Sequence, residues 1–303
     1  MAPTASDAEG YFPRGRSVLR RVHGERAVGR LYGQRALLLQ ACHPLAFAGL
    51  TANTQGHGAP FRRLVHTAKT METVFFGTRA EADRETARVR TMHARVRGSI
   101  AEPAGPHPAG SAYRADDPEF LLWILACLAD SAQAVYERFV RRLTRAERER
   151  FWEDYLVLGE LFGLERRHTP AGYAAYRGYM AERLAGDDLH LTDEARELGR
   201  TVAFDLPLPR HRQPALRAIN HAVAGLLPRP VRELYGIGWS PAHELALEAL
   251  ALSLRGIRPL TPHDLRRGSC ADEYDLVART EAERAKRAAK PAGSRRAAKA
   301  AAF

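Results

Sequence analysis

The chain has 303 residues, of which 45% are hydrophobic and 27% charged, and its formal charge is +11. This composition is typical of a globular protein that can bury a substantial core, and it excludes a fibrous or fully disordered chain. Eight Lys or Arg and only two acids lie in residues 279–303, so about half of the excess charge belongs to the tail. The remaining charge does not indicate a specific nucleic-acid partner.

The three cysteines, Cys42, Cys127 and Cys270, form no paired spacing and no zinc pattern. An odd number without such a pattern is typical of reduced thiols in a cytoplasmic protein. The first residues lack the apolar stretch of a signal peptide, and the longest apolar runs are too short to cross a bilayer. We therefore expect a cytoplasmic protein without a transmembrane segment.

The N-terminal residues 1–25 are polar and rich in glycine, and we expect them to form a flexible arm. An apolar helical pattern begins at about residue 26 and is expected to bend or restart at Pro44, which lacks an amide donor. Residues 51–60 contain several glycine and proline residues, which predicts a loop.

Residues 62–97 predict two helices that meet at Phe76-Gly77-Thr78. Thr78 and Glu81 have the spacing of a capping box, which marks the start of the second helix. In that helix four residues recur at the spacing of one helical face: Val89, His93, Val96 and Ile100. This pattern predicts a helix that continues to Ile100, with His93 in the middle of an apolar face.

Further helix starts are indicated by a capping residue, in several cases followed by proline. They lie at Asp117-Pro118, Thr144, Thr169-Pro170, Thr192 and Ser240-Pro241. Residues 102–114 predict a long loop, and no alternation is long enough to indicate a sheet. We expect an all-α bundle of about nine or ten helices in a single domain, residues 26–275, followed by a basic, disordered tail, residues 276–303.

Each helix of the 62–97 hairpin carries one histidine, and histidine is a common ligand of metals and of haem iron. From the pattern alone, His93 is either a ligand or a satisfied core histidine. His66 is either a ligand or, with Lys69 and Thr70, part of a solvated face. No phosphate-binding loop, nucleophile elbow or zinc-protease motif is present in the sequence.

Several short motifs occur in a characteristic order. They are Arg35–Pro44 (RALLLQACHP), Arg63-x-x-His66-Thr67, Val74-Phe-Phe-Gly77, Arg90-x-x-His93-x-x-Val96-Arg97, Asp117-Pro-x-x-Leu-x-Trp123, Ser131-x-x-x-x-Tyr136, and Leu227-Pro with Tyr235-Gly. Together they resemble the MpaB/rubber oxygenase family, which includes bacterial latex-clearing proteins and the oxygenase of mycophenolic acid biosynthesis. The resemblance runs from about residue 30 to about residue 260.

This resemblance implies a globin-like all-α fold around a non-covalent haem b. It makes His93 the proximal iron ligand. Arg90 and Arg97 become candidate partners of the haem propionates, because a guanidinium can pair with two carboxylate oxygens. They could instead pair with nearby acids such as Asp83.

The family's Arg-x-x-Lys-Thr motif, on the other side of the haem, corresponds to Arg63, His66 and Thr67. Histidine stands here in place of the lysine, so His66 is either a sixth iron ligand or a hydrogen-bond donor to dioxygen. Arg63 and Thr67 would orient or polarise that dioxygen. A second departure is Leu125, where many relatives have histidine.

The resemblance therefore implies a haem-dependent oxygenase that uses dioxygen as co-substrate. Its other substrate would be a small apolar molecule, such as an alkene or isoprenoid, held between the helices of residues 37–50 and 120–136. The sequence elements specific to rubber oxygenases are not recognisable. The alternative is a non-catalytic, haem- or lipid-binding helical protein.

Overall fold

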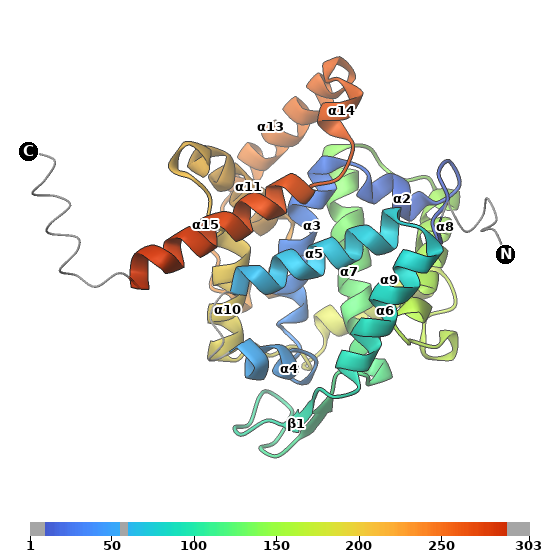
Figure 1. The fold of residues 1–303 in the computed structure, drawn as a ribbon, viewed down its shortest axis with the longest axis vertical. Helices are drawn as coiled ribbons and strands as arrows, with labels where there is room; N and C mark the ends of the chain where they lie inside the picture. The colour runs from blue at the N-terminus through green and yellow to red at the C-terminus, as the bar shows by residue number, and fades with distance from the viewer. Residues whose placement is uncertain (1–9, 55–59, 290–303) are drawn as a thin grey trace, which may run out of the picture.

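The computed structural model describes residues 10–54 and 60–289. Within these residues it contains fourteen α-helices and two short strands, which confirms the predicted all-α class (Figure 1). The helices outnumber the nine or ten expected. The additional ones include α2 (Val18–His23), α12 (Arg229–Leu234) and α14 (His263–Arg266), which have only four to six residues. So short a helix spans too few turns to show an apolar period.

Two long helices cross the centre of the molecule and pack against each other: α3 (Arg26–Gln40) and α7 (Pro118–Phe139). Asp117 caps α7 and Pro118 occupies its first turn, as predicted. Among the described helices, α7 alone is long and apolar enough to cross a membrane. However, 72% of its apolar 18-residue segment is buried inside the protein. That burial is what a core helix shows.

The remaining long helices surround this pair. They are α4 (Pro44–Thr54), α8 (Arg145–Leu161), α9 (Tyr173–Ala185), α10 (Asp193–Phe204), α11 (Gln213–Leu226), α13 (Pro241–Ile257) and α15 (Ala271–Ala289). Short 3-10 turns lie at Arg166–His168, Arg210–Arg212 and Arg258–Leu260. One continuous cluster of buried side chains, from Phe12 to Ala251, joins most of these elements.

The predicted hairpin is formed by α5 (Pro60–Phe76) and α6 (Arg79–His93). The capping box of Thr78 and Glu81 is present, as predicted: the threonine hydroxyl accepts from the Glu81 amide while the glutamate side chain accepts from the Thr78 amide. The predicted end of the second helix is wrong, because α6 stops at His93 instead of continuing to Ile100.

The chain after α6 forms a strand. β1 (Arg97–Ser99) pairs antiparallel with β2 (Ala112–Arg114), and Gly98 lies opposite Tyr113. A Cβ atom on Gly98 would lie 2.7 Å from the Tyr113 hydroxyl oxygen, so this close approach requires glycine. Glycine also disfavours a helix interior by about 1 kcal/mol relative to alanine. The helix therefore ends before Gly98, and part of the loop expected at residues 102–114 is a strand.

Two predictions about the ends of the chain are also corrected. The expected arm of residues 1–25 is ordered from residue 10, because Phe12 and Leu19 are buried in the core and α2 is helical; residues 1–9 lie outside the described part. The expected disordered tail begins too early, because α15 runs to Ala289 and lies beside α5 (Figure 1). Residues 290–303, and 55–59 of the predicted loop, also lie outside the description.

Candidate functional site

A cavity of about 1060 Å³ lies between the central helices and the layer formed by α5, α6 and α15. Ligand and cofactor sites in proteins usually measure about 300–1,000 Å³, so this cavity is at the upper end of that range. Most of its wall is aliphatic or aromatic. The two wall segments predicted from the sequence do line it, through Leu37, Leu45, Phe47 and Leu50 on one side and Phe120, Leu121, Ile124 and Leu128 on the other.

His93 is the last residue of α6, and its half-buried side chain lines the cavity. Its Nδ1 is buried and has no hydrogen-bond partner in the part of the chain that the structure describes. Burial lowers the pKa of His93, and the Arg63 guanidinium lowers it further, while Asp116 acts in the opposite direction. The ring is therefore neutral at pH 7, and a neutral imidazole offers a lone pair to a metal.

Arg63 enters the same cavity wall from α5. The residue is exposed overall, but the apolar wall beside it partly desolvates the guanidinium and lowers its pKa, because an apolar surrounding disfavours the charged form. Among residues 10–54 and 60–289 no carboxylate forms an ion pair with it. A cation held beside an apolar cavity without such a counter-ion is suited to an anionic group on a ligand, which a guanidinium can bind through two parallel hydrogen bonds.

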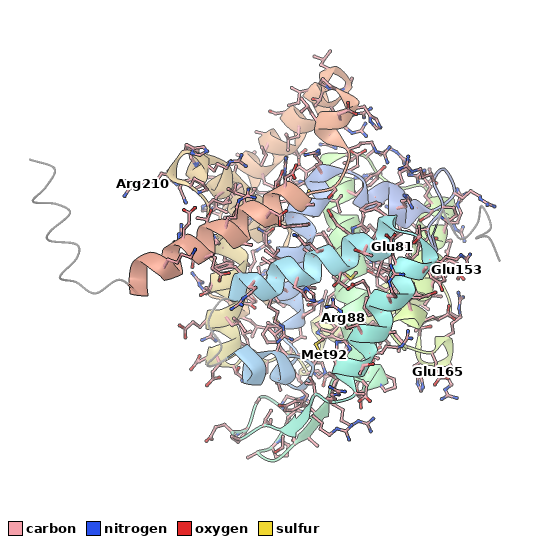
Figure 2. The ribbon with its side chains drawn as sticks, viewed as in Figure 1. Glu81, Arg88, Met92, Glu153, Glu165 and Arg210 are labelled. Atoms are coloured by element: carbon pink, nitrogen blue, oxygen red, sulfur yellow. The ribbon has the colours of Figure 1, made fainter. Side chains whose placement is uncertain are left out.

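His66 and Thr67 also line the cavity from α5. The His66 Nε2 lies 2.8 Å from an amino nitrogen of Arg88 on α6, and that guanidinium also pairs with Glu85 at 2.6 Å. Figure 2 shows Arg88 and Met92 on the side of α6 that faces α4 and α5. A guanidinium can only donate, so the Nε2 of His66 must accept. This contact occupies the lone pair of Nε2 and leaves Nδ1 as the ring nitrogen that carries a proton.

Arg90 and Arg97 are not brought to the cavity. Arg90 donates to the carbonyl of Leu161 at 2.5 Å and so gives a hydrogen-bond partner to a carbonyl at the C-terminal end of α8. Arg97 lies on β1 and donates to the carbonyl of Ala94. The alternative pairing with Asp83 is absent as well within the described chain, where that carboxylate accepts from Tyr11 at 2.7 Å.

Sequence reasoning missed several polar residues of the wall, among them Arg88 and Gln34. Gln34 is buried, and with Arg30 and Leu37 it forms a cavity-facing set at i, i+4 and i+7 on α3. That spacing is the signal by which it could have been found. Arg88 gives no such signal, because arginine is abundant in this chain. Leu125 is a buried part of the wall.

The fold and cavity define an all-α protein that encloses a large apolar site with a neutral histidine on its wall. The family model described as "ER-bound oxygenase mpaB/B'/Rubber oxygenase, catalytic domain" matches residues 20–256. The chain belongs to this oxygenase family, which confirms the predicted resemblance and makes the protein an oxidoreductase.

Two mycobacterial relatives match a large part of the chain. One is an uncharacterised protein of Mycobacterium bovis and the other an uncharacterised protein of Mycobacterium tuberculosis, strain H37Rv. Each is 28% identical over 207 residues, which cover 67% of this chain and 77% of the relative. No solved structure gives a significant match.

Proposed function

We propose that this oxygenase binds haem b through His93 and uses dioxygen to oxidise a small apolar substrate held in the cavity. The observation that carries the proposal is the neutral His93 ring, whose buried Nδ1 lacks a described partner at the wall of a large apolar cavity. When bound, haem would supply the redox-active iron that reacts with dioxygen.

The cavity residues fit such a group. His93 would hold the iron. Arg63, without a described counter-ion, would pair with a propionate, the role that Arg90 and Arg97 do not reach. The hydroxyl of Thr67 follows Arg63 by one helical turn on the same wall and would donate a hydrogen bond to dioxygen.

His66 would act as a hydrogen-bond donor and not as a resident iron ligand. Arg88 occupies its Nε2 lone pair, so the nitrogen that a metal would need is already used. The proton on Nδ1 is left to donate. A ligand role would first require the Arg88 contact to break.

The apolar wall favours an apolar substrate, such as an alkene or isoprenoid, because burying apolar surface stabilises binding by about 25 cal/mol per Å². The second candidate is a non-catalytic haem or lipid carrier. It is favoured by Leu125, an apolar wall residue where many relatives carry histidine.

Absorption spectra of the purified protein, oxidised and reduced and with added haemin, test the proposal. We expect a Soret band that His93→Ala abolishes or strongly shifts. His168→Ala, which changes an exposed histidine in a 3-10 turn, should leave the band unchanged. A colourless protein that takes up no haemin would refute the proposal.

Dioxygen uptake separates the two candidates. The oxygenase should consume dioxygen when one member of a panel of alkenes and isoprenoids is added to the reduced, haem-loaded protein. A haem-loaded protein that consumes none with any member supports the carrier.

A further inference from the structure

One buried amide on the cavity wall has no partner within the protein. Gln34 of α3 is only 6% exposed and lines the cavity. Its side chain forms no hydrogen bond with any residue that the structure describes. Buried polar side chains are normally hydrogen-bonded, so each exception calls for a physical explanation. Because this amide borders the cavity, its missing partner is a molecule that enters the cavity.

Other polar side chains of the wall are bonded within the protein. Thr70 donates to Glu85 at 3.2 Å, and the Tyr274 hydroxyl donates to the Gly29 carbonyl at 3.2 Å. The amide of Gln40 donates to a carbonyl of α7 at 3.3 Å. These side chains therefore contribute to the fold, and a ligand would have to compete for them.

A second buried glutamine shows what a structural role looks like. Gln133 of α7 is 7% exposed and does not line the cavity. Its amide nitrogen donates to the Tyr173 hydroxyl at 2.6 Å and to Glu137 at 3.2 Å. Gln34 is equally buried but makes no such bond in the described chain, so its amide does not stabilise the fold in this way.

The charges beside Gln34 indicate an uncharged ligand group. Arg30 precedes it by one helical turn, lines the same wall and pairs with both carboxylate oxygens of Glu273 on α15, the shortest contact being 2.6 Å. Arg212, which lines the cavity from the start of α11, is exposed, and an exposed charge pair contributes little. A neutral amide that both donates and accepts suits a hydroxyl or carbonyl oxygen.

The cavity has room for a ligand that extends beyond such an oxygen. Alanines of α11 line it at Ala215, Ala218 and Ala222, while His93 lines it from the end of α6. Figure 1 shows α11 on one side of α3 and α6 on the other. The cavity therefore spans both sides of the helix that carries Gln34, and an elongated molecule fits it better than a compact one.

We propose that Gln34 is a specificity-determining residue that binds an uncharged oxygen, a hydroxyl or carbonyl, of an otherwise apolar ligand. A pure hydrocarbon in the same place would remove water from the amide and leave it without a partner, which weakens binding. An alcohol or aldehyde satisfies the amide and still buries its apolar chain. With its oxygen at Gln34, the ligand would present a fixed double bond towards His93; this last step rests on the proposed function, while binding at Gln34 does not.

Equilibrium dialysis of the full-length protein, as purified, tests the proposal with two ligands. They are geraniol and the hydrocarbon that lacks only its hydroxyl group. The measured quantity is the ratio of the two dissociation constants, compared between wild type and variant, because this comparison cancels the different solubilities of the ligands in water. Gln34→Met, which keeps the length of the side chain, should shift the ratio about fivefold in favour of the hydrocarbon.

Two control variants should keep the wild-type ratio within about twofold. Gln133→Met is the same substitution at a buried site away from the cavity. Tyr32→Phe removes the hydroxyl of a second buried wall residue that has no hydrogen bond in the described chain. Tyr32 lies about 200° around α3 from Gln34 and so faces a different part of the wall.

Urea unfolding of the same variants separates a binding role from a structural one. Gln34→Met should not lower the urea midpoint, because no hydrogen bond within the protein is lost. Gln133→Met should lower it, because the bonds to Tyr173 and Glu137 are lost. If Gln34→Met lowers the midpoint as much as Gln133→Met does, the amide of Gln34 serves the fold and the proposal is wrong.

The binding data can overturn the proposal in four ways. The wild type could bind neither ligand, or Gln34→Met could keep the wild-type ratio. Tyr32→Phe could shift the ratio as strongly, which would assign the effect to the general polarity of the wall. Geranic acid could lose more affinity in Gln34→Met than geraniol does, which would make the site one for a charged group. The Soret band of the same samples keeps the two proposals apart: a ratio shift in protein that takes up no haemin retains this inference and refutes the proposed function.

Discussion

Two histidines of this protein, His23 and His93, are both buried enough to be neutral, yet their surroundings differ. His23 lies in the core, its Nε2 is 2.8 Å from the Tyr155 hydroxyl, and its ring stacks on Phe75 at 4.1 Å. Burial lowers the pKa of His23 to about 3 and also lowers that of His93. Of these two histidines, only His93 has a buried ring nitrogen without a hydrogen-bond partner in the described chain, and only His93 lines the cavity. A lowered pKa thus marks burial, while the missing partner distinguishes the candidate site.

Alanine substitutions should separate the two environments most strongly. His23→Ala removes a hydrogen bond and a stacked ring from a closed core, so we expect the free energy of unfolding to fall by about 2–4 kcal/mol. His93→Ala removes a side chain at a cavity wall and should change it by less than about 0.5 kcal/mol. Urea unfolding followed by circular dichroism measures both values. Equal losses of unfolding free energy in the two variants would show that His93, like His23, serves in packing.

The pH dependence of stability should follow from His23. Its unfolded pKa is about 6.5, whereas its folded pKa is about 3. Above pH 6.5 both states are neutral. Below it the unfolded state binds a proton that the folded state excludes, so the free energy of unfolding falls by about 1.4 kcal/mol per pH unit towards pH 3.

His23→Gln should flatten this slope by that amount between pH 6 and pH 4, because its amide does not titrate. His168→Gln, the exposed control, should keep the wild-type slope. A slope that is the same in His23→Gln and the wild type would show that His23 is protonated in the folded protein. His43, whose pKa burial lowers to about 4, contributes a second and similar loss.

The features predicted correctly from the sequence are those that depend on neighbouring residues. The capping box at Thr78 and the caps at Asp117, Thr144 and Ser240 formed as predicted. The helix start predicted at Thr169-Pro170 is wrong, because α9 begins at Tyr173 after Gly172, and the Pro170 carbonyl accepts from the distant Trp152 ring instead. Each cap is a hydrogen bond between residues two or three positions apart, so the sequence pattern already contains both partners. The helix break before Pro44 belongs to the same group.

The features missed depend on contacts between distant parts of the chain. The end of α6 follows from the approach of Tyr113 to Gly98, and the position of Arg90 follows from the Leu161 carbonyl, 71 residues away. Phe12 is ordered by a core that its own segment does not reveal. Periodicity within one helix contains no information on such partners.

The candidate site shows the same division. Family motifs placed His93, Arg63, His66 and Thr67, and the structure brings all four to one cavity. Arg88, which holds His66, lies outside the quoted motifs and was not predicted. Its contact crosses from α6 to α5 and joins two exposed side chains, so neither burial nor spacing indicates it.

The smallest effect on stability, and the most informative on the site, is expected from Arg88→Ala. Exposed ion pairs contribute about 0–1 kcal/mol, so loss of the pair with Glu85 should change the free energy of unfolding by less than about 0.5 kcal/mol. The substitution leaves the Nε2 of His66 without its donor. If haem is held by His93, the freed Nε2 of His66 would be available to the iron, and we expect the ferric absorption spectrum to shift towards the low-spin form.

Arg84→Ala, one turn earlier on α6, provides the matched control and should leave the spectrum unchanged. Combining Arg88→Ala with His66→Ala should remove the shift, which assigns it to the histidine and not to a wider opening of the cavity. An Arg88→Ala spectrum identical to that of the wild type would show that His66 does not reach the iron. His66, like His23, would then have no role as an iron ligand, even with its partner Arg88 removed.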